Sequence, residues 1–160
     1  MISPLIKSHQ GNLDLLELPL TAFLCSRKVP AETVLRCYDW AIAQRDAGNC
    51  VISGFHSPLE KDVLRYLLKG KQPVVLALAR GMKQTWEPPL QKALDDGRLV
   101  IVSPFTEKIR RASEDTASVR NDLMIQLADQ VVVGYANPDG MFIKQLQIYE
   151  SRKAISFLSF

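Results

Sequence analysis

Short apolar runs alternate with stretches of helical periodicity along this sequence, and that alternation limits the possible folds more than any other feature. The runs are nearly continuous, as in Val74-Val-Leu-Ala-Leu78 and Val131-Val-Val133. Such runs are typical of strands that are buried on both faces, and parallel sheets are buried in this way. Strands are therefore predicted over residues 20–25, 50–53, 73–79, 98–103, 130–136 and 154–158.

Helices fit between these strands, because apolar residues recur there with the i, i+3, i+4, i+7 spacing of one buried face. They are predicted over residues 31–47, 58–68, 88–95, 118–128 and 140–151. Alternating strands and helices predict a three-layer Rossmann-like α/β sandwich with a mostly parallel sheet of about six strands. Residues 1–19 are interpreted as a lead-in segment and residues 20–160 as a single domain. The polar stretch 104–117 is a candidate lid or binding loop.

Composition excludes several other classes of protein. Hydrophobic residues make up 47% of the 160 residues and charged residues 23%, which argues against a disordered chain. No apolar run reaches the roughly 18 residues of a membrane span, and the N-terminus lacks the pattern of a secretory signal. Three cysteines without C-x-x-C spacing are expected to be reduced, in the cytoplasm, and not to bind zinc. The net charge is only +3, so binding of a polyanion would require positive charge concentrated at one site.

Candidate binding residues follow the predicted strands, because ligands of open α/β sheets bind at the carboxyl ends of the strands. Ser57, Pro58 and Glu60 predict a capped helix start, and a helix start with nearby backbone donors can bind phosphate. Cations stand close to the ends of the first and third strands. The candidates after the strands are Ser26, Arg27, Ser53, Gly54, Phe55, His56, Ser57, Glu60, Arg80, Gly81, Lys83 and Gly140.

Simpler structural roles are open for many of these residues. Ser57 and Glu60 can form only a helix cap, Gly54 only a tight turn, and Phe55 can lie in the core. His56 lies beside two serines, but no third group is present to orient it, so a hydrolase is not favoured. Two histidines without clustered ligands give little support for a catalytic metal.

Several segments, in order over residues 20–157, together resemble the Rossmann domain of the DNA-processing protein A (DprA/Smf) family. That family lies within a wider group of Rossmann-like nucleotide-binding folds that includes the LOG proteins. The segments are Ala22-Phe-Leu-Cys25-Ser26-Arg27, Val51-Ile-Ser53-Gly54, Val74-Val-Leu-Ala-Leu-Ala-Arg80-Gly81, Arg120-Asn121-Asp122, and Asp139-Gly140 followed by Lys153-Ala-Ile-Ser-Phe157. The chain departs from the family pattern at Cys25, where the family has glycine, at Pro58 and Glu60, where it has glycine and aspartate, and at Asp122, where it has arginine.

The resemblance implies a non-catalytic module that binds single-stranded DNA, or a nucleotide phosphate, in DNA uptake and recombination. On that resemblance, Arg27 would make a bidentate phosphate contact, Arg80 and Lys83 would follow the backbone, and Phe55 would offer a stacking face. The resemblance also implies a homodimer and a recombinase partner, and no cofactor is expected.

Arg120 and Asn121 would close the pocket from its far side, although Arg120 can instead pair with Asp122 or Asp129. Two other functions are open: a sensor for a small nucleotide derivative, and a LOG-like nucleotide phosphoribohydrolase. Against a phosphoribohydrolase, the chain lacks the Pro-Gly-Gly-x-Gly-Thr phosphate loop of the LOG proteins, for which Asn137-Pro-Asp-Gly140 is a poor substitute. Strong salt dependence of binding would favour a DNA strand over a single nucleotide as the ligand, since several phosphates would be neutralised.

Overall fold

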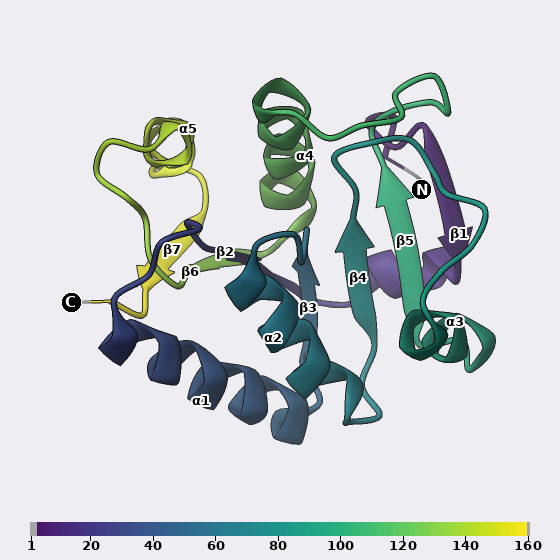
Figure 1. Cartoon of the computed structure of the whole chain (residues 1–160), viewed down its shortest axis with the longest axis horizontal. Helices are drawn as coiled ribbons and strands as arrows, with labels where there is room; N and C mark the ends of the chain where they lie inside the picture. Colours follow the sequence, from purple (N-terminus) through teal and green to yellow (C-terminus); the bar gives the residue numbers. More distant parts are fainter. Residues whose placement is uncertain (1–2, 160) are drawn as a thin grey trace.

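A seven-stranded sheet forms the centre of the computed structural model, which describes residues 3–159 (Figure 1). The strands are β1 (Ser8–Gly11), β2 (Leu20–Leu24), β3 (Cys50–Ser53), β4 (Val74–Ala77), β5 (Leu99–Ser103), β6 (Gln130–Val133) and β7 (Ala154–Phe157). Their order across the sheet is β1-β5-β4-β3-β2-β6-β7. All neighbouring pairs are parallel except β1 and β5, which are antiparallel.

Helices cover both faces of the sheet. They are α1 (Ala31–Ala47), α2 (Pro58–Leu68), α3 (Pro88–Asp95), α4 (Glu114–Leu127) and α5 (Met141–Tyr149), with a 3₁₀ helix, η1, at Leu13–Glu17. Phe23 and Val51 pack on the side of α1, α2 and α3, whereas Leu24 and Ile52 pack on the side of α4 and α5. Successive residues of a strand point to opposite faces, so a run that is apolar throughout supplies both cores.

The order of the strands reverses at β2. From β2 the chain moves outward through β3, β4 and β5, and then returns through α4 to β6 on the other side of β2. The connection after β2 leads to α1, and the connection after β6 leads to α5 on the opposite face. A reversal of this kind leaves a crevice at the carboxyl ends of the strands, where such folds bind ligands.

The predicted fold class is confirmed, and α1, α2 and α3 have the predicted bounds. β1 was not predicted, and it lies within the segment interpreted as a lead-in. α4 begins at Glu114 instead of residue 118, because Ser113 and Thr116 form a capping box there. α5 is shorter than predicted at both ends. Within residues 3–159, none of the helices has the length and apolar character needed to cross a membrane.

Candidate functional site

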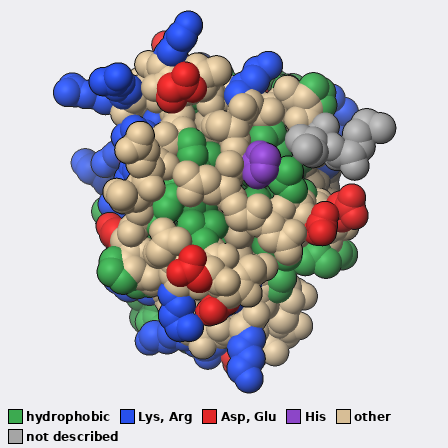
Figure 2. Space-filling view, turned by 90° about the vertical axis from the view of Figure 1, so that its right-hand side faces the viewer, with side chains coloured by type: hydrophobic (Ala, Val, Ile, Leu, Met, Phe, Trp, Pro, Cys, Tyr) green, Lys and Arg blue, Asp and Glu red, His purple; other side chains and the backbone are tan. Residues whose placement is uncertain are grey.

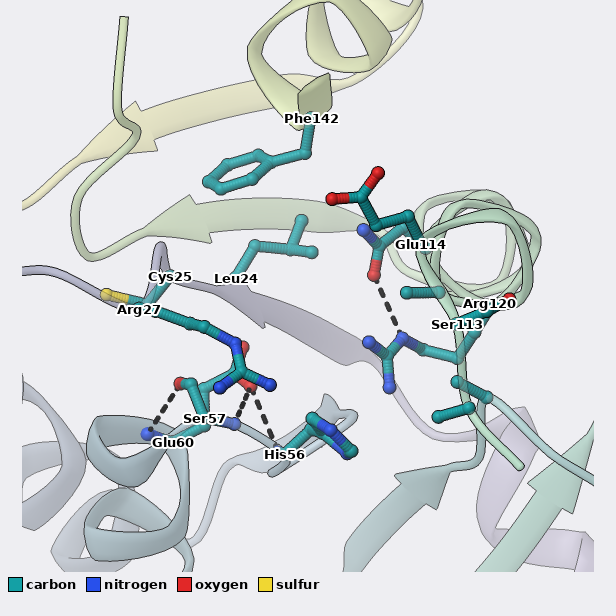
Figure 3. Close-up of a pocket in the computed structure, with 14 residues that line it drawn as sticks. Leu24, Cys25, Arg27, His56, Ser57, Glu60, Ser113, Glu114, Arg120 and Phe142 are labelled. Carbon is teal, nitrogen blue, oxygen red and sulfur yellow. Dashed lines mark hydrogen bonds between the residues drawn. The ribbon is translucent and has the colours of Figure 1, made fainter. Parts of the chain in front are cut away.

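A cavity of about 300 Å³ opens at the carboxyl end of β2, between the start of α2 and the side of α4 (Figure 3). We call it the strand-end pocket. Six of the residues predicted from the sequence line it, and the structure brings them together from three separate parts of the chain. They are Arg27, His56, Ser57, Glu60, Arg120 and Asn121.

The start of α2 forms one wall of the pocket, and its backbone amides are already bonded to a carboxylate of the same helix, that of Glu60. The Ser57 hydroxyl accepts a hydrogen bond from the Glu60 amide at 3.3 Å. In return, Oε1 of Glu60 accepts from the amides of His56 at 3.0 Å and Ser57 at 3.1 Å. This is the predicted capping box. The two amides that could have held a phosphate therefore already donate to a buried carboxylate, which is only 7% exposed.

Arg120 supplies the opposite charge from the α4 side. It is 7% exposed, yet its guanidinium lines the pocket. Nε donates to Oδ1 of Asn121 at 2.9 Å, and Nη1 reaches the Ala77 carbonyl only at 3.4 Å. Among residues 3–159, Nη2 has no hydrogen-bonding partner and Arg120 forms no ion pair. A buried guanidinium with free donors is suited to an incoming anion.

Gly54 makes room for this arginine. A Cβ atom at residue 54 would lie 2.0 Å from Nη1 of Arg120 and 2.5 Å from its Cζ. The Ser-Gly turn after β3 thus fixes where the guanidinium can lie, although Gly54 is not among the residues that line the pocket.

Electrostatic effects within the pocket are mixed. Burial lowers the pKa of Arg120, and the charge of Glu60 opposes that shift. Burial also lowers the pKa of His56, with further lowering from Arg120 and Arg27, while Glu60 again acts in the opposite sense. The nearby positive charges thus outweigh that of Glu60 in their effect on the pKa of His56. A second carboxylate, that of Glu114, also lines the pocket.

Four of the predicted residues support the turns around the pocket instead of lining it. Ser53 is fully buried, and its hydroxyl accepts from the amide of Phe55 at 3.3 Å. Phe55 is 4% exposed and packs in the core on the α1 side, where its φ of 45° directs it, so little of its ring is available for stacking. The hydroxyl of Ser26 accepts from the amide of Asn137 at 2.8 Å, and the amide of Gly140 donates to the carbonyl of Asn137 at 2.8 Å.

Arg80, Gly81 and Lys83 follow β4 and lie toward the β1 edge of the sheet, beside β5 and β1. The Gly81 amide donates to the carbonyl of Ile109 at 2.7 Å, which ties this turn to the loop before α4. Lys83 lies 5.7 Å from the ring centre of Trp86. None of the three lines the strand-end pocket. Figure 2 shows the β1 side of the molecule, where Lys and Arg side chains gather at the margins around a mostly uncharged centre.

The apolar wall and the far rim of the pocket were not predicted from the sequence. These residues are Leu24, Cys25, Ala79, Ala112, Ser113, Glu114, Ala117 and Phe142. Ser113 had a usable signal, because Ser113-x-x-Thr116 can form a capping box. The alanines carried no local signal, since their place depends on how α4 packs over the sheet.

The structure offers no evident metal site: within residues 3–159, no three His, Cys, Asp or Glu side chains gather closely enough to hold an ion. All three cysteines are buried and free. A hydrogen bond with Cys37, together with burial, raises the pKa of the Cys25 thiol, so this thiol is a poor nucleophile.

Comparison with known proteins gives a result for structure and none for sequence. No protein-family model matches the chain, and no curated protein matches it. The chain matches DNA processing protein A from Helicobacter pylori with a TM-score of 0.73 and 15% identity. That structure was described for the way the Helicobacter pylori protein binds single-stranded DNA. The match covers 96% of this chain and 74% of that one.

Two further structures place the fold more widely. DNA processing protein A from Streptococcus pneumoniae matches with a TM-score of 0.74 and 16% identity over 93% of this chain, which spans about half of that protein, 53%. The molybdenum cofactor binding protein of Rippkaea orientalis matches with a TM-score of 0.60 and 10% identity, over 88% of this chain and 76% of that one. The resemblance predicted from the sequence is therefore confirmed in the fold: this chain is built like DNA processing protein A, within a wider set of Rossmann-like proteins.

Proposed function

We propose that this chain is a non-catalytic module that binds single-stranded DNA, with a phosphate of the strand held in the strand-end pocket. The observation that carries the proposal is the buried guanidinium of Arg120, which lines the pocket and whose Nη2 has no hydrogen-bonding partner among residues 3–159. Burying a charge without full pairing is costly, and an incoming phosphate offsets that cost. Arg27 adds an exposed second cation at the rim.

The comparisons support this choice of ligand. The Helicobacter pylori protein, which shares the fold over nearly the whole of this chain, binds single-stranded DNA. The strand-end pocket also lies where open α/β sheets bind ligands, at the reversal of strand order.

Fluorescence anisotropy with a labelled strand of about 20 nucleotides tests the proposal. We expect binding that weakens between about 50 and 200 mM salt, because each phosphate contact releases counterions. Arg27→Ala should weaken it strongly, whereas Lys28→Ala should not, since Lys28 is an exposed neighbouring cation that does not line the pocket. Absence of binding at low salt would overturn the proposal.

A free nucleotide or nucleotide derivative is the second candidate ligand, and the carboxylates favour it. Glu60 and Glu114 line the pocket beside Arg120, so it can accept hydrogen bonds from sugar hydroxyls as well as donate to a phosphate. A single small ligand would show a shallow salt dependence, with few phosphates neutralised. A thermal-shift screen of mononucleotides would detect it, and release of free base from the bound nucleotide would reveal phosphoribohydrolase activity.

We infer that the bound strand passes to a recombinase during DNA uptake, and that the chain acts in the cytoplasm as a homodimer. The three free, buried cysteines are compatible with a reducing compartment. Light scattering across a concentration series would test the dimer, and co-purification with a recombinase on a single strand would test the partner.

A further inference from the structure

A row of cations runs along the exposed side of α2, away from the strand-end pocket. Lys61, Arg65 and Lys69 follow one another at intervals of four residues, so they lie on one side of the helix, and all three are exposed. The row begins beside the pocket, because Lys61 directly follows Glu60, which lines it. Figure 1 shows α2 beginning next to the carboxyl end of β3 and running alongside α1.

Two tyrosines lie at the far end of this row. A second cavity of about 210 Å³ lies between α1 and α2, lined by Tyr38, Asp62, Arg65, Tyr66 and Lys69. The ring centres of Tyr38 and Tyr66 are 5.2 Å apart, and Lys69 Nζ lies 5.5 Å from the ring centre of Tyr66. Both rings are half-buried, so each is held in place while part of it reaches the surface.

Hydrogen bonds and an ion pair fix this arrangement further. The Tyr38 hydroxyl donates to Oδ2 of Asp62 at 2.6 Å, and Arg65 forms an ion pair with the same carboxylate. Asp62 therefore joins the tyrosine of α1 to the row of cations on α2. Rings held in this way lose little conformational freedom when a ligand stacks on them.

A row of cations that ends beside half-buried aromatic rings matches the chemistry of a single strand. Lysine and arginine follow the phosphates, while aromatic rings stack on unpaired bases without regard to their identity. An acidic peptide would use the cations and leave the rings without a role. A duplex would keep its bases stacked on one another and unavailable to tyrosine.

We propose that single-stranded DNA leaves the strand-end pocket along α2, with its phosphates beside Lys61, Arg65 and Lys69 and a base stacked at Tyr38 and Tyr66. This rests on the proposed function, since the pocket begins the path. From Ser57 to Lys69 the helix rises about 18 Å. That length corresponds to about five nucleotides at the B-form spacing of roughly 3.4 Å, and to fewer in an extended strand.

Strand length separates the path along α2 from the pocket. Anisotropy with a labelled strand of about 12 nucleotides, and competition with a dinucleotide, which is too short to reach Lys69 from the pocket, would be measured for wild type, Lys69→Ala, Tyr66→Leu and Arg27→Ala. Tyr66→Leu keeps an apolar side chain in place and removes the aromatic ring together with its hydroxyl. Lys92→Ala is the control, because Lys92 is 78% exposed and lies on α3, outside both cavities.

For the longer strand, Tyr66→Leu should weaken binding at least fivefold, the lower limit for one stacked base. Lys69→Ala should reduce the slope of log K against log salt by about 0.7, the value for one phosphate of a single strand. Neither change should alter binding of the dinucleotide, whereas Arg27→Ala should weaken binding of both. Lys92→Ala should behave as wild type.

The possible failures are distinct. If the longer strand binds and depends on Arg27, but not on Lys69 or Tyr66, the path along α2 is wrong and the proposed function stands. Binding that depends on Tyr66 and Lys69 but not on Arg27 would support the α2 path and overturn the pocket. Equal competition by polyglutamate, with no effect of Tyr66→Leu, would show a surface for acidic polymers and overturn the stacking. No binding of any strand would overturn both proposals.

Discussion

Gly54→Ala tests whether the position of the Arg120 guanidinium matters for binding. A Cβ atom at residue 54 would lie 2.0 Å from Nη1 and 2.5 Å from Cζ of Arg120. Nonbonded heavy atoms approach one another to about 3.5 Å, so the guanidinium would have to move by roughly 1.5 Å. Such a movement would strain or break the 2.9 Å hydrogen bond from Nε to Asn121 and displace the guanidinium within the pocket.

Gly54→Ala is expected to lower both the stability of the protein and its affinity for the strand, and the loss of affinity has the higher lower limit. Overpacking one methyl group costs about 1–3 kcal/mol, and the reduced freedom of the unfolded chain offsets about 0.4–1 kcal/mol of it. The free energy of unfolding should therefore fall by about 0–2.5 kcal/mol. Loss of one hydrogen bond to a charged group costs about 1.5–3 kcal/mol, which corresponds to a roughly 10- to 150-fold increase in Kd.

A double-mutant cycle gives the decisive measurement. The Kd for a labelled strand and the free energy of unfolding in urea would be measured for wild type, Gly54→Ala, Arg120→Ala and the double variant. In the Arg120→Ala background the clash has no partner, so Gly54→Ala should change Kd by less than about twofold. Equal losses in both backgrounds would refute the reasoning, as would wild-type affinity in a folded Gly54→Ala protein.

Arg120→Met should leave the free energy of unfolding unchanged or raise it by up to about 4 kcal/mol, because a poorly paired buried charge is removed, yet it should weaken strand binding at least about tenfold. Urea denaturation and anisotropy on one sample would show both effects, and a strong loss of stability would contradict the argument. Glu60→Gln keeps an oxygen to accept from the amides of His56 and Ser57, so the cap should survive in thermal unfolding, while loss of the negative charge should tighten strand binding. Weaker strand binding by this variant would indicate that the carboxylate contacts the ligand. Because burial, with Arg120 and Arg27, lowers the pKa of His56 in the folded chain, its contribution to stability is lost as pH falls below the ordinary value of about 6.5, where the unfolded chain binds the proton first. A bound phosphate offsets the two arginine charges, so affinity for a strand without terminal phosphates should rise as pH falls from about 7 to 5. His56→Gln should flatten the pH profiles of both stability and affinity. An affinity profile that this variant leaves unchanged would exclude this role of His56.

The sheet and most helices could be predicted because their signals are local. The apolar run at residues 74–78 is long enough to show a strand buried on both faces, and Ser57 with Pro58 marks the start of α2. β1 lacks such a signal, because Ser8–Gly11 is polar and only alternates between half-buried and exposed. It is a strand because it pairs with β5, and that pairing depends on the tertiary structure.

The site was harder to predict than the fold, for a physical reason that Phe55 and Lys83 illustrate. Both residues come shortly after a strand, where ligands bind, but sequence position does not fix the direction of a side chain. A positive φ turns Phe55 into the core, and Lys83 lies near Trp86 at the β1 edge of the sheet, away from the pocket. For Arg120 the burial itself could not be predicted, since nothing in the sequence around it indicates that this charged residue of α4 is buried.

The capping box of α2 also has a consequence for rates. The amides of His56 and Ser57 are already bonded to Glu60, so the rigid backbone contributes little there to holding a phosphate. Retention then depends on two arginine side chains, and Arg27, unlike the buried Arg120, is exposed at the rim. Contacts that are not preorganised give up binding energy to ordering, and that loss is expressed mainly as faster dissociation. A strand held in this pocket should therefore have a short residence time and exchange readily with a competing strand.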